Sequence, residues 1–198
     1  MQALCFVCLR VSVKGLENFP RRGPALAVVN HLGDADAALM LCELPMAADA
    51  LGKIELYFFP VLGTIMDWYG FIWLHRGRPD RRAMHAALQG LGEGRVIVLA
   101  PEGRYTQAGG LEEGGHGAAF LALKADVPVV PVALTGTQNA IVYGNMRRLR
   151  RTPVTMTIGE PFRLEARADR RAAMQHGTRR IMESLARLLP PEYRGTYE

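Results

Sequence analysis

The sequence predicts an α/β domain in which a mixed sheet is flanked by helices. Short apolar runs such as Ala25–Val29 and Val96–Leu99 have the length of buried strands, and they alternate with segments of helical periodicity. The chain has 198 residues, of which 49% are hydrophobic and 22% charged, so it can form one full core. We therefore predict a single domain over residues 1–198, without internal repeats or linkers.

Turn and cap residues set the bounds of the predicted elements. Alternating apolar and polar residues predict a first strand over Leu9–Lys14, which ends at Gly15. The buried strand over Ala25–Val29 leads into an Ala- and Leu-rich helix over Ala35–Leu44. The other predicted elements are strands over Ala47–Lys53, Phe71–Leu74, Val96–Leu99 and Val154–Ile158, and helices over Pro60–Trp68, Arg81–Leu91 (with Asp80 as its cap) and Ala118–Ala125.

Two later segments contain residues that interrupt regular structure. Pro128 and Pro131 lie in the apolar segment Val127–Val132. Because proline donates no ladder hydrogen bond, they predict an edge strand or a bulge there. The final helix is predicted over Arg167–Leu189, and Gly177 predicts an interruption within it.

The composition favours anionic partners and a reducing compartment. The net charge is +5 and the pI is about 9.4, which favours phosphate-bearing ligands or anionic surfaces. The arginine cluster at 147–151 is interpreted as a solvated basic face or as a membrane contact. Three cysteines, an odd number, favour reduced thiols over disulfides, and no metal site is predicted. No apolar run approaches the ~18 residues that predict a membrane span.

Missing motifs argue against several reaction classes. Ser12 and Ser184 are the only serines, and neither lies in the G-x-S-x-G elbow of a serine hydrolase. The chain also lacks the phosphate-binding G-x-x-x-x-G-K-[ST] loop and the zinc-binding H-E-x-x-H motif. His31 remains as the candidate catalytic residue. It lies at the carboxyl end of a predicted strand, and Asp36 lies in the first turn of the next predicted helix. A neutral imidazole can take a proton from a hydroxyl, and a carboxylate on its other nitrogen can orient it.

A second histidine and aspartate have the same spacing. His75 and Asp80 are also five positions apart, but Asp80 is the predicted helix cap and His75 is flanked by arginines that lower its basicity. We therefore assign the base to His31. From the residues alone, a purely structural role for His31 stays equally open.

Four sequence blocks occur in the order typical of one enzyme family. Asn30–Asp36 matches an N-H-x-x-x-x-D block, and Pro101–Arg104 is similar to a P-E-G-T-R-S block. The other two blocks are represented by Lys53–Leu56, Pro60, Gly63 and Gly70–Arg76, and by Val127–Val132. From Val11 to Gly159 the chain thus resembles the glycerolipid acyltransferases of the lysophosphatidic acid acyltransferase type.

This resemblance implies a glycerolipid acyltransferase-like fold and a direct acyl transfer without an acyl-enzyme. The expected donor is acyl-CoA or acyl carrier protein, the acceptor is the hydroxyl of a lysophosphatidic acid-type lipid, and no metal or organic cofactor takes part. The resemblance assigns the catalytic roles to His31 and Asp36. It further implies a cytoplasmic protein bound peripherally to the inner face of the cell membrane, and residues 1–10 are interpreted as a remnant docking segment.

Acceptor binding is assigned by the same resemblance. The substrate-binding candidates are Arg76, Glu102, Gly103, Arg104 and Lys53. A guanidinium can hold phosphate oxygens bidentately, and glycine lets the backbone approach a ligand. For Lys53 and Arg104, a solvated surface charge is the alternative.

Three departures from the family pattern bear on the acceptor. Gly33 stands where a serine is common, His75 stands where an aspartate is common, and Arg104 comes one position before the usual arginine. One alternative is therefore the same chemistry on glycerol 3-phosphate, another lysophospholipid or a glycolipid. Another is a non-catalytic binder of anionic ligands or nucleic acid, but no aromatic residues are interleaved with the arginine cluster, so no nucleic-acid partner is expected.

Overall fold

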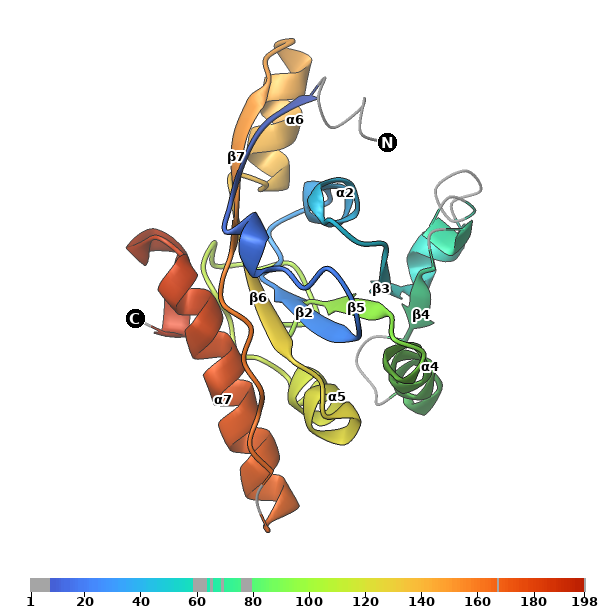
Figure 1. The fold of residues 1–198 in the computed structure, drawn as a ribbon. Coiled ribbons are helices and arrows are strands. Elements are labelled where there is room, and N and C mark those ends of the chain that lie inside the picture. Colours follow the sequence, from blue (N-terminus) through green and yellow to red (C-terminus); the bar gives the residue numbers. More distant parts are fainter. Residues whose placement is uncertain are drawn as a thin grey trace.

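A seven-stranded mixed sheet with helices on both faces forms the centre of the computed structural model (Figure 1). The structure describes residues 8–58, 64, 66–68, 70–75, 80–166 and 168–197. The strand order is β1-β7-β6-β2-β5-β3-β4. The strands are β1 (Leu9–Lys14), β2 (Ala25–Val29), β3 (Ala48–Lys53), β4 (Ile72–Leu74), β5 (Val96–Leu99), β6 (Val129–Thr135) and β7 (Thr152–Ile158). Strands β2 to β6 run parallel, and β1 and β7 run in the opposite direction.

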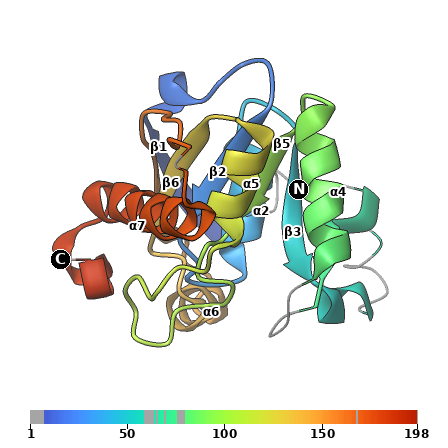
Figure 2. The same cartoon turned by 90° about the horizontal axis from the view of Figure 1, so that it is seen from below.

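Two apolar layers cover the sheet. The helices α4 (Arg81–Gly92), α5 (Gly117–Ala125) and α7 (Arg170–Leu188) pack on one face, and α2 (Ala35–Glu43) and α6 (Asn139–Arg147) pack on the other (Figures 1 and 2). Alternate residues of β2 therefore enter different layers. Leu26 and Val28 join the first, and Ala25, Ala27 and Val29 join the second. This explains why β2 has no polar alternation, because both of its faces are buried.

The predicted elements occur with bounds that shift by at most three residues. The predicted helix over 60–68 lies largely outside the described residues. The structure also contains elements that the sequence patterns did not predict: α6 and the short 3-10 helices η1 (Leu16–Asn18), η2 (Ile54–Phe58), η3 (Pro191–Tyr193) and η4 (Gly195–Tyr197). No helix in the described part of the chain is long and apolar enough to cross a bilayer.

The edge position predicted for the proline-containing strand is wrong, because β6 lies between β2 and β7. The carbonyl of Pro131 accepts a hydrogen bond from Gly159 N, so the side of Pro131 that lacks an N–H faces the segment after β7. The ladder to β2 is therefore intact. On the other side, Val129 pairs with Phe162 while Val132 pairs with Ile158, so the register shifts by one residue. The proline thus lies at a bulge-like offset within a central strand.

The interruption predicted at Gly177 is also wrong, because α7 is continuous from Arg170 to Leu188. A Cβ at Gly177 would lie 3.2 Å from the Cβ of Ala119 in α5 and 2.9 Å from a methyl group of Leu164. The glycine therefore permits close packing of α7, and burial against α5 outweighs its low helix propensity.

Candidate active site

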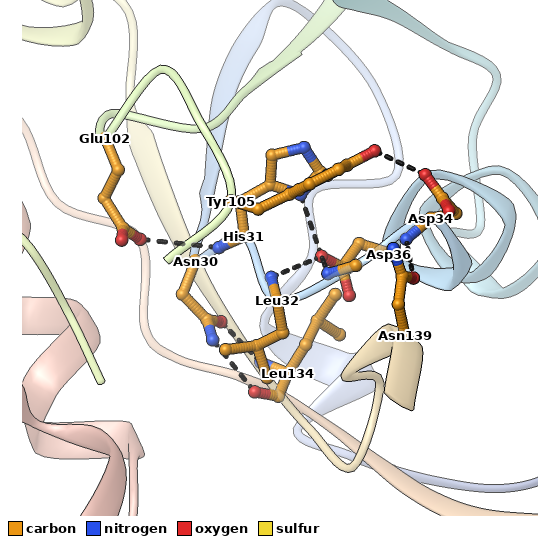
Figure 3. Close-up of polar contacts among 10 residues, drawn as sticks. Asn30, His31, Leu32, Asp34, Asp36, Glu102, Tyr105, Leu134 and Asn139 are labelled. Carbon is orange, nitrogen blue, oxygen red and sulfur yellow. Dashed lines mark hydrogen bonds and ion pairs between the residues drawn. The ribbon is translucent and has the colours of Figure 1, made fainter. Parts of the chain in front are cut away.

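The ends of β2 and β5 bring the first and third sequence blocks together. These strands are neighbours and run parallel, so the residues that follow them leave the sheet at the same edge. His31 N donates to Oε1 of Glu102 at 3.4 Å, and Thr106 N donates to the His31 carbonyl at 2.9 Å. The loop after β5 thus holds the His31 backbone on both sides. Figure 3 shows the contact with Glu102.

His31 and Asp36 form a direct hydrogen bond, with 2.8 Å between Nδ1 and Oδ2 (Figure 3). The backbone N–H groups of Leu32 and Gly33 donate to the same carboxylate oxygen at 2.7 and 2.9 Å. Asp36 is 2% exposed in the first turn of α2, where the unpaired N–H groups and the helix dipole favour a carboxylate. The backbone around His31 thus holds the Asp36 carboxylate in place, and the carboxylate in turn orients the imidazole.

This geometry leaves one ring nitrogen available for chemistry. Because Asp36 Oδ2 acts as an acceptor, the ring proton is assigned to Nδ1 and the lone pair to Nε2. The His31 side chain is 17% exposed and lines a cavity. A group oriented by a buried acid and open on its other side can accept a proton from a substrate hydroxyl.

Asn30 links the end of β2, directly before His31, to the neighbouring strand β6. Its side-chain amide donates to the Leu134 carbonyl at 2.9 Å and accepts from Leu134 N at 2.7 Å (Figure 3). Asn30 is 2% exposed, so both bonds are buried. Asn30 therefore ties the backbone before His31 to β6.

Glu102 is a buried carboxyl group beside His31. Burial raises its pKa to about 7, although backbone N–H groups of Glu112 and His31 donate to it and act in the opposite direction. Near neutral pH this carboxyl group is therefore partly protonated. The sequence block named Glu102 as a substrate-binding candidate, and the structure places it against the His31 backbone.

The raised pKa of Glu102 predicts a pH-dependent stability. The ordinary value is 4.5, so the folded state holds the proton more tightly, and the stability present below pH 4.5 is lost as the pH rises through 7. We expect the free energy of unfolding to fall by about 3 kcal/mol more in the wild type than in Glu102→Gln between pH 5 and pH 8. Urea titrations at both pH values measure this difference, and parallel pH slopes would contradict it.

Asp34 forms a second polar cluster next to the pair. The hydroxyls of Tyr105 and Tyr143 donate to its two carboxylate oxygens at 2.5 and 2.7 Å, and Asp34 N donates to Asn139 Oδ1 at 2.8 Å. Burial by itself would raise the pKa of Asp34, but the hydrogen bonds with Tyr105, Tyr143 and Asn139 and the charge of Lys53 together hold the pKa below its usual value. The Tyr105 ring also packs edge-on against the His31 ring, with 4.2 Å between centroids.

Sequence reasoning missed Tyr105, Tyr143 and Asn139. Tyr105 occupies the position of the arginine in the P-E-G-T-R-S pattern, so aligning the block residue by residue could have found it. Tyr143 and Asn139 had no comparable signal, because the helix that carries them was not predicted. Their approach also accounts for Gly33, since a Cβ there would clash with the Thr137 carbonyl and the Asn139 side chain.

A cavity of about 190 Å³ adjoins His31. Lys53 and Gly103 line it, and most of the other lining residues are apolar: Leu51, Leu74, Met84, Leu99, Ala100 and Ala118. Gly103 has φ +70°, a conformation that favours glycine where the loop turns beside the cavity. In the described residues no group of three His, Cys, Asp or Glu side chains could hold a metal ion.

The predicted arginines have different positions. Arg104 is 60% exposed and is held by Glu112 Oε2, with its Nε at 3.0 Å and its Nη2 at 2.8 Å. Arg76 lies outside the described residues. Of the predicted substrate-binding cations, Lys53 is therefore the one that the structure places at the cavity.

The second histidine and aspartate also form a pair. His75 Nδ1 lies 3.0 Å from Asp80 Oδ2, and Asp80 Oδ1 accepts a hydrogen bond from Ala83 N at the start of α4. The hydrogen bonds from the backbone of His75 and Ala83 lower the Asp80 pKa. Asp80 is therefore the helix cap that the sequence predicted.

A larger surface groove, of about 920 Å³, lies between α7 and the segment after β7. None of the predicted site residues lines it. Two of its arginines face acids within it: Arg179 is 2.8 Å from Glu183, and Arg180 is 4.0 Å from Glu165. We therefore place the candidate site at the smaller cavity, which contains His31.

Comparison with known proteins identifies the family of the chain. The profile of the family named Acyltransferase matches residues 10–135. The chain is 30% identical to the 1-acyl-sn-glycerol-3-phosphate acyltransferase of Limnanthes douglasii over 77% of its own length and 54% of the relative's. It is 31% identical to the human 1-acyl-sn-glycerol-3-phosphate acyltransferase alpha over 66% and 47%. The chain thus spans about half the length of these curated relatives.

A solved structure agrees with the fold over almost the whole chain. The crystal structure of the 1-acyl-sn-glycerophosphate (LPA) acyltransferase PlsC from Thermotoga maritima matches with a TM-score of 0.73 and 25% identity. The match covers 94% of this chain and 75% of the other. The α/β fold with its seven-stranded mixed sheet agrees with that structure. By its sequence profile, its relatives and its fold, the chain belongs to the Acyltransferase family.

Proposed function

We propose that this protein is an O-acyltransferase that moves a fatty acyl group from an acyl thioester to the hydroxyl of a lysophosphatidic acid-type lipid. The observation that carries this proposal is the hydrogen bond between His31 and buried Asp36 beside a largely apolar cavity. The names of the relatives support the choice of acceptor. The donor is acyl-CoA or acyl carrier protein, and the lipid acceptor places the enzyme peripherally on the inner face of the cell membrane.

In the proposed mechanism, Nε2 of His31 takes the proton of the acceptor hydroxyl as its oxygen attacks the thioester carbonyl. Asp36 holds the imidazolium that forms. The carbon–sulfur bond then breaks, and the thiolate takes the proton from His31, so the products are an ester and a free thiol. The histidine returns to its starting state without a covalent intermediate.

The cavity and its charged residues suggest how the substrates are held. The apolar side chains of Leu51, Leu74 and Met84 suit part of the acyl chain. Lys53 provides a positive charge for a phosphate at the same cavity. We assign Glu102 and Gly103 to shaping the loop against which the acceptor lies, and Arg76 to the acceptor phosphate.

A second candidate has the same chemistry but an acceptor without a terminal phosphate. Tyr105 favours this candidate, because it stands where the family pattern has an arginine. Its hydroxyl donates to Asp34 and carries no positive charge for a phosphate. Arg104 is held by Glu112, so its guanidinium is already paired. A negative charge at Asp34 next to His31 would also repel a phosphate that came close to it.

A panel of acceptors tests both candidates. Thiol release from acyl-CoA would be followed with lysophosphatidic acid, lysophosphatidylcholine and monoacylglycerol, for the wild type and for Arg104→Gln. We expect the highest kcat/KM with lysophosphatidic acid. In the variant we expect a change within about threefold, because the Arg104 guanidinium is exposed and already paired with Glu112.

The other outcomes are equally informative. If monoacylglycerol is the best acceptor, the second candidate holds. If no acceptor stimulates thiol release while the protein binds DNA or RNA in a strongly salt-dependent manner, the protein is a non-catalytic polyanion binder and the proposal fails.

A further inference from the structure

The helix α6 and the turn after it carry a cluster of arginines without neighbouring acidic residues in the sequence. From Val127 to Gly159 the chain has no aspartate or glutamate and has four arginines, all of them at 147–151. Figure 1 shows α6 beside β7 at one end of the molecule, away from α7. Figure 2 shows it at the end toward which β3 runs. We call α6 and residues 148–151 the α6 tip.

The α6 tip also exposes large apolar side chains. Ile141, Tyr143 and Met146 are 41–45% exposed, and Leu149 is 97% exposed. Leu149 has φ +53°, a left-handed conformation that is unfavourable for a branched, non-glycine residue. This leucine contributes neither burial nor favourable backbone geometry to the fold.

One of the four arginines of the α6 tip is held by a contact within the protein, and the other three are exposed to solvent without an acidic partner in the described residues. Nε and Nη2 of Arg151 both donate to the Leu9 carbonyl, so Arg151 ties the tip to the start of β1. Arg147, Arg148 and Arg150 are exposed, and none of them has an acidic partner in the described part of the chain. The exposed Leu149 is therefore flanked in the sequence by three arginines that have no ion-pair partner in the described residues.

We propose that the α6 tip docks on an anionic phospholipid bilayer. In this arrangement Arg147, Arg148 and Arg150 bind lipid phosphates, while Leu149 and Met146 enter the interface. Charge alone would suit any polyanion, but a fully exposed leucine among the arginines gains free energy only where an apolar phase is available. A bilayer offers both, whereas a nucleic-acid backbone offers only the charge.

The position of α6 connects this surface to the candidate active site. Asn139 and Tyr143 lie on α6, and both are hydrogen-bonded to Asp34, three residues after His31 (Figure 3 shows Asn139 and Asp34). A bilayer bound at the α6 tip would thus contact the same helix that is hydrogen-bonded to the start of α2, close to His31. This orientation rests on the proposed function, whereas vesicle binding by the tip does not require turnover.

Vesicle binding tests the proposal directly. The full chain would be sedimented with vesicles of phosphatidylglycerol and phosphatidylcholine, and with phosphatidylcholine alone, at several salt concentrations. Each arginine near an anionic surface contributes about fivefold, so the triple variant Arg147→Gln/Arg148→Gln/Arg150→Gln should lower the partition coefficient about 100-fold. The matched control, Arg21→Gln/Arg22→Gln/Arg171→Gln, removes the same charge from other exposed positions and should retain most of the binding.

A second variant separates docking from folding. Leu149→Gly removes the apolar side chain and relieves the left-handed backbone, so we expect an equal or higher Tm together with several-fold weaker vesicle binding. If the two triple variants bind anionic vesicles equally, or if Leu149→Gly binds like the wild type, the proposal is wrong. Loss of binding to RNA or to an acidic carrier protein, with vesicle binding unchanged, would overturn it in favour of those partners.

Activity measurements keep this proposal apart from the proposed function. With a soluble short-chain acceptor, the triple variant should release thiol at the wild-type rate, and with an acceptor embedded in anionic vesicles it should be slower. A chain that binds vesicles through the tip but transfers no acyl group would disprove the enzyme function and leave the docking surface intact.

Discussion

Replacement of His31 by alanine is expected to lower the rate of thiol release about 10²- to 10⁴-fold, which is the usual contribution of a positioned general base. The reason is geometric. Nδ1 is held by Asp36 at 2.8 Å, so Nε2 is the nitrogen that can take the acceptor proton, and no other described histidine lines the cavity. The measurement is single-turnover or steady-state thiol release with acyl-CoA and saturating acceptor.

His75 provides a matched control for this variant. It has the same spacing to its aspartate, and its Nδ1 lies 3.0 Å from Asp80 Oδ2, but its partner caps α4. His75→Ala should therefore keep thiol release within a few-fold of the wild type while lowering the Tm. Equal losses in the two variants, or turnover of His31→Ala close to that of the wild type, would remove His31 from the mechanism.

The strands could be predicted because their signal is local. In β2, five consecutive apolar residues are buried on both faces, and that pattern is present in the sequence itself. The order of the strands in the sheet has no such local signal. Whether Pro131 lies in an edge or a central strand depends on which side of its backbone needs an N–H, and only the packed sheet decides this.

The same distinction applies to the candidate site. His31 and Asp36 are five positions apart at a strand-to-helix junction, so their contact is a local property that the sequence could predict. The ion pair of Arg104 with Glu112 also spans a short stretch of chain, but it depends on the path of an irregular loop. Tyr143 reaches Asp34 across 109 positions, and such a contact has no local signature at all.

Substitution of Asp36 should lower turnover as much as substitution of His31, because Asp36 acts on the reaction through the His31 imidazole. In Asp36→Asn the side-chain oxygen can keep its three hydrogen bonds, because Oδ1 has no hydrogen-bond partner in the described structure and leaves a place for the amide nitrogen. The negative charge that stabilises the imidazolium is lost. We expect kcat to fall about 10²- to 10⁴-fold, with KM for the acceptor nearly unchanged.

Stability separates two substitutions at this position. Asp36→Asn buries an amide without a partner and should cost about 1–3 kcal/mol of unfolding free energy. Asp36→Ala removes the common acceptor of Leu32 N, Gly33 N and His31 Nδ1, so its cost should be larger. Urea titrations at pH 7 measure both values.

The decisive experiment is the double variant His31→Ala/Asp36→Asn. If Asp36 acts only by orienting and stabilising the His31 imidazolium, its substitution has nothing further to remove once the ring is gone. The double variant should then turn over at the rate of His31→Ala alone, so that the two losses do not add. If the losses multiply instead, Asp36 acts on the substrate or on the fold independently of His31, and the hydrogen bond between them is not the element that carries catalysis.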